Sequence, residues 1–95
     1  MTVYMLRCAD GSFYVGSTKQ EIEARVWEHN NLPVEGYTAK RRPVSLVFTE
    51  SYERITDAIA RERQIKGWSR KKKEALIALS YDALPGLSRR SHLTR

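Results

Sequence analysis

Two short runs of β-branched and aromatic residues, Val3–Cys8 and Ser12–Gly16, stand close together near the beginning of the chain. The tripeptide Ala9-Asp10-Gly11 separates them and places a glycine where a tight turn needs a left-handed residue. Because strands joined by so short a connection can pair only antiparallel, the pattern predicts a β-hairpin as the first element of the fold.

The length of the turn decides where two tyrosines of the hairpin point. With a two-residue loop at Asp10-Gly11, Tyr4 and Tyr14 lie on opposite faces of the strands. With a three-residue loop in which Gly11 makes a bulge, they share one face, and we predict this register. The plainer interpretation is that both tyrosines only pack, since tyrosine is favoured in strands for that reason alone.

A helix is predicted after the hairpin. Thr18 and Glu21 have the spacing of a capping box, in which the threonine caps the helix and the glutamate reaches back. The helix is expected to run from about Lys19 to Asn30. Residues 30–42 are polar and show no periodicity, so they predict a loop.

The rest of the chain predicts one strand and two helices. Apolar and polar residues alternate over residues 44–49, which indicates a third strand. A second helix is expected over about residues 56–66 and ends at Gly67, and Ser69 can cap a third helix that runs through Leu79. The order of hairpin, helix, strand, helix and helix is typical of the α+β class.

The composition is that of one folded domain with a basic surface. Among 95 residues, 41% are hydrophobic and 29% are charged, which excludes a disordered chain. Residues 1–80 are expected to form the domain, and residues 81–95, basic and short of apolar side chains, a flexible tail. The 17 Lys and Arg against 11 Asp and Glu give a net charge of +6, which favours a polyanionic partner, above all nucleic acid. Charge alone fits an inert basic surface equally well.

Cysteine content and hydropathy restrict the compartment. The single cysteine, Cys8, excludes an intramolecular disulfide, and together with two histidines it offers too few ligands for a zinc cluster. No run of about 18 apolar residues is present. We therefore expect a cytoplasmic protein that has no membrane span.

Glu62 is the first candidate for chemistry. A helical wheel of the second helix places it near the centre of an apolar stripe formed by Ile55, Ala58, Ile59 and Ile65. A carboxylate that faces inward has to be paired or bound to a metal. Both an ion pair with an arginine and a metal site therefore fit Glu62.

Arg25 and His29 are the next candidates. They are spaced i, i+4 in the first helix and flank the apolar stripe of Ile22 and Val26. Each has a plainer interpretation when taken alone. His29 could bond a carbonyl at the end of the helix, and Arg25 could be the ion-pair partner of Glu62.

Basic side chains gather in the predicted loop and at the start of the third helix. Four cations in the first turn of a helix, at residues 70–73, oppose the helix dipole and so indicate an external anion. Trp27 or Trp68 could stack on an unpaired base, although packing is the plainer role of Trp68. The candidate nucleic-acid contacts are Lys40, Arg41, Arg42, Lys66, Arg70, Lys71, Lys72 and Lys73.

Four motifs occur in a fixed order: Thr2-Val3-Tyr4, Tyr14-Val15-Gly16, Arg25 with His29, and Ala58-x-x-x-Glu62-x-x-Ile65-Lys66. In this order, over about residues 2–79, the chain resembles the small free-standing bacterial branch of the GIY-YIG nuclease superfamily, which includes the N-terminal nuclease domain of the excision-repair protein UvrC. Thr2-Val3 departs from the Gly-Ile of the family name but keeps the tyrosine and the strand character. The resemblance implies a three-stranded antiparallel sheet flanked by about three helices.

The resemblance also implies hydrolysis of phosphodiester bonds in nucleic acid, DNA more than RNA. Its catalytic residues would be Tyr4, Tyr14, Arg25, His29 and Glu62. Glu62 would hold one divalent ion, Mg²⁺ or Mn²⁺, and Arg25 would brace the scissile phosphate. One of the two tyrosines, ranked nearly equal, would take the proton of the attacking water, and His29 would assist. A partner protein or the shape of the substrate would set the choice of target.

Two other functions use parts of the pattern. A non-catalytic nucleic-acid-binding module needs only the basic segments. A protein-interaction domain needs only a basic face, with Glu62 and Arg25 as a structural pair. The enzyme is the prediction that uses all five site residues, and incubation of labelled DNA and RNA with Mg²⁺ or EDTA distinguishes it from the others.

Overall fold

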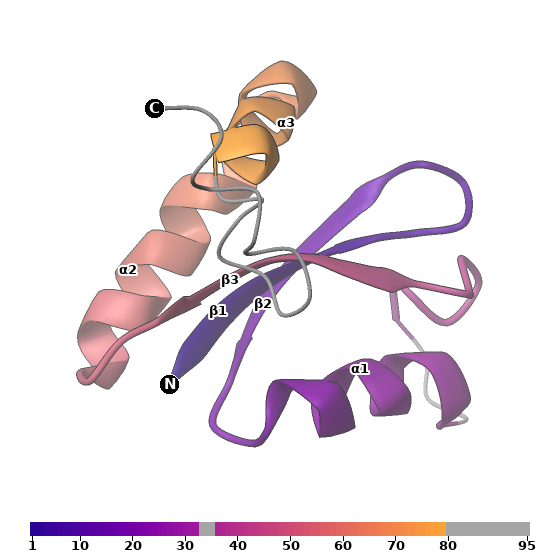
Figure 1. The fold of residues 1–95 in the computed structure, drawn as a ribbon, viewed down its shortest axis with the longest axis horizontal. Helices are drawn as coiled ribbons and strands as arrows, with labels where there is room; N and C mark the ends of the chain where they lie inside the picture. Colours follow the sequence, from indigo (N-terminus) through magenta and orange to yellow (C-terminus); the bar gives the residue numbers. More distant parts are fainter. Residues whose placement is uncertain (33–35, 80–95) are drawn as a thin grey trace, which may run out of the picture.

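The computed structural model describes residues 1–32 and 36–79, which form a three-stranded antiparallel sheet and three helices. The elements are β1 (Thr2–Arg7), β2 (Phe13–Thr18), α1 (Ile22–Asn31), β3 (Ser45–Ser51), α2 (Ile55–Lys66) and α3 (Arg70–Leu79). The strand order is β2-β1-β3, and α1 lies on one side of the sheet with α2 and α3 on the other (Figure 1). The α+β class is confirmed, whereas the predicted tail at residues 81–95 lies outside the described residues.

The hairpin turn has the predicted three-residue loop. The amide of Cys8 donates to the carbonyl of Ser12 at 2.8 Å, and the amide of Gly11 donates to the carbonyl of Cys8 at 2.9 Å. Gly11 has a φ of +87°, a left-handed conformation that a side chain would strain. The loop therefore consists of the three residues between Cys8 and Ser12.

This turn fixes the register of the two tyrosines. Tyr14 lies opposite Leu6, and Tyr4 lies opposite Gly16. Residues paired across a ladder project from the same face, and Tyr4 and Leu6 are two apart in β1. The prediction that Tyr4 and Tyr14 share a face is confirmed.

Alternation along the strands divides the core into two layers. The layer under α2 and α3 consists of Val3, Met5, Val15, Phe48, Ala58 and Ile65. The layer under α1 consists of Tyr4, Leu6, Cys8 and Val44, with Tyr14, Ile22, Val26 and Leu46 packed against them. Both faces of the sheet are thus buried, and the face that carries the tyrosines is the one under α1.

The third strand departs from the regular alternation predicted for residues 44–49. Its register against β1 shifts, so that Met5 lies opposite Phe48 while the next residue, Leu6, lies opposite Leu46. One extra residue in a strand moves the following side chains to the other face. Leu46 consequently packs under α1, and Phe48 packs under α2.

The first helix begins later than predicted. Thr18 is the last residue of β2, where it pairs with Thr2 and is buried, and its Oγ1 accepts the amide of Gln20 at 3.2 Å. Glu21 stands at the N-cap and makes no side-chain hydrogen bond there. The predicted capping box is wrong because strand pairing holds Thr18 in the sheet, and the helix starts at Ile22.

The end of α2 and the start of α3 agree with the predicted helix boundaries. α2 ends at Gly67, and the hydroxyl of Ser69 accepts an amide of the first turn of α3 at 3.2 Å. The predicted apolar stripe of α2 is buried at Ala58 and Ile65, but Ile55, the first residue of the helix, is 44% exposed. None of the helices described is long and apolar enough to cross a bilayer.

Candidate active site

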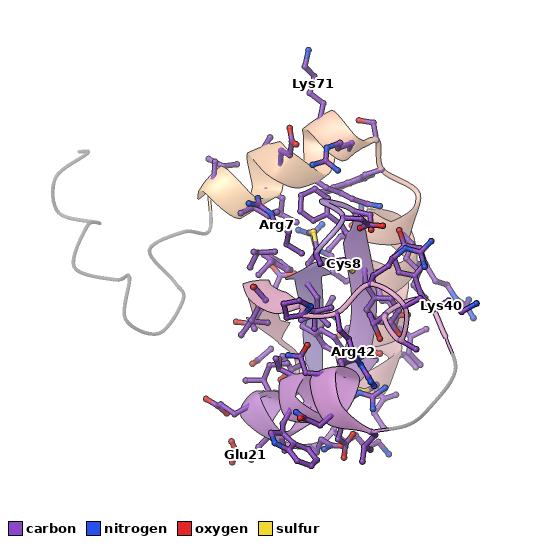
Figure 2. The ribbon with its side chains drawn as sticks, turned by 90° about the vertical axis from the view of Figure 1, so that its right-hand side faces the viewer. Arg7, Cys8, Glu21, Lys40, Arg42 and Lys71 are labelled. Atoms are coloured by element: carbon purple, nitrogen blue, oxygen red, sulfur yellow. The ribbon has the colours of Figure 1, made fainter. Side chains whose placement is uncertain are left out.

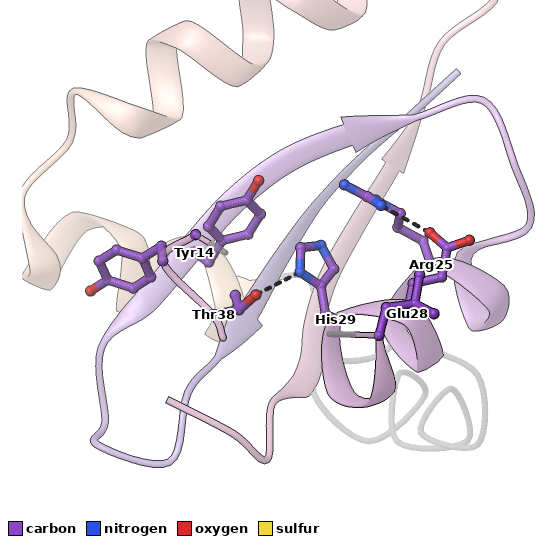
Figure 3. Close-up of a pocket in the computed structure, with 8 residues that line it drawn as sticks. Tyr14, Arg25, Glu28, His29 and Thr38 are labelled. Carbon is purple, nitrogen blue, oxygen red and sulfur yellow. Dashed lines mark hydrogen bonds and ion pairs between the residues drawn. The ribbon is translucent and has the colours of Figure 1, made fainter. Parts of the chain in front are cut away.

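Four predicted site residues meet on the α1 side of the sheet. The hydroxyl of Tyr4 lies 2.8 Å from Nε2 of His29, and Nε of Arg25 donates to the same hydroxyl at 3.3 Å. The ring centroid of Tyr14 lies 6.2 Å from that of Tyr4 and 5.0 Å from that of His29. Figure 3 shows Tyr14, Arg25 and His29 gathered between α1 and the strands. Two strands and one helix therefore supply one cluster.

Gly16 makes room for the cluster. A Cβ at this position would stand 2.9 Å from Cζ of the Tyr4 ring, closer than such contacts allow. Sequence reasoning placed Gly16 in a motif but gave it no role. The signal was present, because a glycine inside a strand often marks a close approach of another group.

His29 uses both of its ring nitrogens. Nε2 bonds Tyr4, and Nδ1 lies 2.9 Å from Oγ1 of Thr38, a buried residue of the segment between α1 and β3 (Figure 3). Burial and the positive charge of Arg25 lower the pKa of His29, so that the imidazole is neutral at pH 7. Sequence reasoning missed Thr38, because an aperiodic loop carries no signal for such a contact.

Tyr4 is held as a neutral phenol. Burial raises the pKa of Tyr4 to about 12, although the hydrogen bond from Arg25 acts in the opposite direction. The negative charges of Tyr14, when ionised, and of Glu62 add to the increase. Tyr4 is thus better suited to hold its neighbours in place than to accept a proton at neutral pH.

Arg25 lies at the edge of the cluster. Its Nη1 forms an ion pair with Oε1 of Glu28 at 2.9 Å, and its side chain is 34% exposed. The alternative of an Arg25–Glu62 ion pair is not what the structure shows. Nη2 of Arg25 has no partner among residues 1–32 and 36–79, so one side of the guanidinium is available to an anion.

A pocket of about 150 Å³ opens beside this cluster. Its lining residues are Tyr14, Arg25, Glu28, His29, Leu32, Gly36, Tyr37 and Thr38 (Figure 3). Tyr4 and Glu62 do not line it. Of the two tyrosines, Tyr14 is therefore the one placed to meet a molecule in the pocket.

Glu62 lies on the other side of the sheet, in α2. Its Oε1 accepts the hydroxyl of Ser17 at 2.5 Å, and its Oε2 pairs with Nζ of Lys66 at 2.7 Å. Partial burial raises the pKa of Glu62, but the hydrogen bonds from Lys66 and Ser17 outweigh it, so that the pKa is lowered. The carboxylate is ionised, and its side chain is 18% exposed.

The two halves of the site meet at β2, an edge strand of the sheet. Gly16 accommodates Tyr4 on one face, and the next residue, Ser17, binds Glu62 on the other. The charge of Glu62 acts on the pKa of Tyr4 across this edge. Adjacent residues of one strand thus support the tyrosine cluster and the carboxylate.

The described residues supply some, but not all, of the ligands that a divalent ion needs. Within the described ranges, 1–32 and 36–79, no group of three or more His, Cys, Asp or Glu residues could enclose a metal. Mg²⁺ is nevertheless commonly bound by one or two carboxylates together with water and phosphate oxygens. The ionised, partly exposed Glu62 fits that kind of site, with Lys66 as the cation that now neutralises it.

The three basic residues of the loop, Lys40, Arg41 and Arg42, differ in how far they are bonded within the protein or exposed to solvent. Arg42 donates to the carbonyl of His29 at 2.7 Å and to that of Leu32, and so closes the end of α1. Arg41 pairs with Asp10 at 3.1 Å and stacks over the exposed ring of Tyr37. Lys40 is exposed and extends away from the ribbon (Figure 2). Of the three predicted phosphate contacts, Arg42 has a structural role, and Lys40 is free to meet solvent.

The cations at the start of α3 also differ in whether they contact other residues or point into solvent. Arg70 donates to the carbonyl of Gly11 at 2.7 Å and pairs with Glu74 at 3.0 Å, and Lys72 lies over the ring of Trp68 at 4.5 Å. Lys71 points away from the molecule (Figure 2). Trp68 is partly buried against the core, as its plainer role predicts.

The chain is thus a small α+β domain in which a cluster of tyrosine, arginine and histidine side chains borders a pocket. The chain belongs to the GIY-YIG catalytic domain family, whose model matches residues 1–75. UPF0213 proteins of Staphylococcus aureus strains Mu50 and N315 are each 47% identical over 75 residues, which is 79% of this chain and 90% of theirs. The solution NMR structure of the UPF0213 protein BH0048 from Bacillus halodurans is similar, with 34% identity, 82% coverage of both chains and a TM-score of 0.54.

Proposed function

We propose that the protein is a divalent-metal-dependent nuclease that hydrolyses phosphodiester bonds in nucleic acid, DNA before RNA. The observation that carries this proposal is the arrangement on the two sides of β2. Arg25 and Tyr14 line the pocket on one side, and the ionised carboxylate of Glu62 binds Ser17 on the other. The net charge of +6 and the membership of a nuclease family support a polyanionic substrate.

Arg25 is the phosphate-binding residue of this proposal. Tyr4 and Glu28 hold Nε and Nη1 of its guanidinium, which fixes the plane of the group, and Arg25 lines the pocket. A guanidinium held in this way loses little entropy when it binds a phosphate oxygen. It also stabilises the negative charge that develops on the phosphate during hydrolysis.

Tyr14 is the proposed base. It lines the pocket, whereas Tyr4 is fully buried and has a pKa raised to about 12. Tyr14, as the phenolate, takes a proton from the attacking water. The water oxygen forms a bond to phosphorus as the bridging P–O bond breaks, and the leaving oxygen takes a proton from solvent. Arg25 lines the same pocket as Tyr14.

Glu62 is the proposed ligand of the divalent ion, Mg²⁺ or Mn²⁺, which would supply positive charge to the non-bridging phosphate oxygens. Ser17 orients one carboxylate oxygen through its 2.5 Å hydrogen bond. Lys66 lies on the other oxygen at 2.7 Å and is itself half exposed, so it can turn to a phosphate when the carboxylate takes another cation.

The proposal is tested by incubating the full chain with end-labelled single-stranded and duplex DNA and RNA, with Mg²⁺, Mn²⁺ or EDTA. Cleavage that requires the metal and is lost in Glu62→Gln and Arg25→Lys supports it. The matched control is Glu74→Gln, since Glu74 also pairs with a cation at i, i+4 but is exposed on α3. Metal-independent retention of nucleic acid without cleavage would instead favour a non-catalytic binding module.

A further inference from the structure

A chain of hydrogen bonds connects Arg25, Tyr4, His29 and Thr38. The distances are 3.3 Å from Arg25 Nε to the Tyr4 hydroxyl, 2.8 Å from that hydroxyl to His29 Nε2, and 2.9 Å from His29 Nδ1 to Oγ1 of Thr38. A guanidinium can only donate, so the oxygen of Tyr4 accepts from it. The buried proton of Tyr4 then has His29 Nε2 as its acceptor, which requires that nitrogen to be unprotonated.

We propose that Thr38 is a positioning residue of the active site, whose hydroxyl accepts the Nδ1 proton of His29 and thereby fixes the ring in the Nδ1–H tautomer. In this tautomer Nε2 accepts the Tyr4 proton, and a lone pair of the Tyr4 oxygen turns to Arg25. Arg25 is thus aimed by a residue that does not touch it. Its kinetic consequence rests on the proposed function, whereas the tautomer does not.

Thr38 is fixed firmly enough for this role. It is 5% exposed, and its carbonyl accepts the amide of Arg41 at 3.0 Å. The carbonyl of Arg41 in turn accepts the amide of Ala9 from the hairpin loop at 2.8 Å. Arg42 ties the same segment to the carbonyl of His29. The segment is therefore anchored both to the hairpin and to the end of α1.

The tautomer can be measured directly. Long-range ¹H–¹⁵N spectra of the full chain at pH 7.5 report which ring nitrogen carries the proton, and a His92→Gln variant assigns the signals, since the chain has two histidines. We expect a protonated Nδ1 and an unprotonated Nε2 in His29. A wild-type ring protonated on Nε2 would overturn the proposal without any substitution at Thr38.

Two variants then test the hydroxyl itself. Thr38→Val removes it at nearly constant volume and should move more than half of the ring population out of the Nδ1–H form, whereas Thr38→Ser should keep the wild-type spectrum. A Thr38→Val spectrum like that of the wild type contradicts the role of the hydroxyl. If Thr38→Val does not fold, a Thr38→Ser ring in the Nδ1–H form supports the proposal, and one in the Nε2–H form contradicts it.

Cleavage rates separate this proposal from the proposed function. With an active enzyme, Thr38→Val should lower kcat about tenfold with little change in KM, and Thr38→Ser should restore it, because misplaced groups lose rate rather than binding. Unchanged kcat in Thr38→Val, with the tautomer lost, would refute positioning and leave the nuclease intact. An inactive wild type with the expected spectrum would refute the nuclease and the kinetic role but keep the tautomer.

Discussion

Gly16 lies directly opposite Tyr4 in the hairpin, and a Cβ on Gly16 would stand 2.8 Å from the Tyr4 hydroxyl oxygen. The same Cβ would stand 3.0 Å from Cε2 of Tyr14. Tyr4 cannot easily yield, because it is fully buried and its hydroxyl is bonded to His29 and Arg25. The absence of one side chain on β2 thus permits both tyrosines to occupy their places.

Gly16→Ala should therefore disturb the site and the fold together. Overpacking of this kind destabilises by about 1–3 kcal/mol, and displacement of Tyr4 should lower cleavage as well. Urea denaturation and the cleavage assay measure the two effects. The control is Gly67→Ala, whose Cβ would meet its nearest neighbour at an ordinary 3.6 Å. Equal losses in the two variants would show that the approach of Tyr4 does not need Gly16.

Some features of the hairpin and of the first helix could be predicted from the sequence, and others could not. The register of Tyr4 and Tyr14 was predictable because Gly11 and the number of turn residues determine it. The helix start at Ile22 was not, because the same Thr18 satisfies both a capping pattern and a strand, and pairing with Thr2 decides between them. Local propensity is weak against such tertiary contacts.

The site was predictable in its residues and less so in its connections. Arg25 and His29 were placed at the core edge by their i, i+4 spacing, and they do meet Tyr4. The pair of Glu62 with Lys66 lies within α2 at i, i+4, but the bond of Glu62 to Ser17 of β2 depends on how α2 rotates over the sheet. A one-dimensional pattern does not contain that rotation.

The two tyrosines should respond differently to loss of the hydroxyl. Tyr14→Phe should reduce turnover by about 10² or more while the free energy of unfolding changes little, since the proposed base is lost at a partly exposed position. Tyr4→Phe should lower stability by about 1–3 kcal/mol, because it leaves buried His29 Nε2 without its partner. Turnover and urea denaturation of both variants provide the test. The reverse assignment of rate and stability losses would make Tyr4 the base.

Glu62→Gln should abolish metal-dependent cleavage and leave nucleic-acid binding nearly unchanged. The substitution removes the charge that holds the cation at almost constant volume, and Ser17 can still donate to the amide oxygen. Binding is measured in the presence of Ca²⁺ by fluorescence anisotropy, and thermal melting shows whether the variant is folded. Full Mg²⁺-dependent turnover in a folded Glu62→Gln protein would remove the carboxylate from the mechanism.

Lys40 and Arg42 should separate affinity from stability. Lys40→Ala should reduce the slope of log K against log salt by about 0.9 on duplex or about 0.7 on single strands, because one phosphate contact is lost. Arg42→Ala should instead lower the free energy of unfolding, since it leaves the carbonyls of His29 and Leu32 without their donor. Salt titrations and urea denaturation check the pair. A lower slope in Arg42→Ala with unchanged stability would reverse the two roles.

The pKa of His29 predicts how stability depends on pH. Burial and the charge of Arg25 lower this pKa below the unfolded value of about 6.5, so that between the two values the unfolded chain binds more protons than the folded one. The contribution of His29 is therefore complete above about pH 6.5 and declines as the pH falls through the folded-state pKa. The ionisable groups that face the ring are Tyr4, Tyr14, Arg25, Glu28 and Arg42.

These neighbours do not obscure the effect. Glu28 has a lowered pKa, because Gln20 and Arg25 donate to its carboxylate. The contribution of Glu28 to the free energy of unfolding is therefore lost only below about pH 4.5, which is below the range in which His29 titrates. His29→Gln keeps an amide near the hydroxyl of Tyr4 and removes the titration. The difference in free energy of unfolding between wild type and this variant should thus shift against the wild type as the pH falls from about 7 to 5. Urea denaturation across that range measures it, and a difference that stays constant would show that His29 titrates alike in both states.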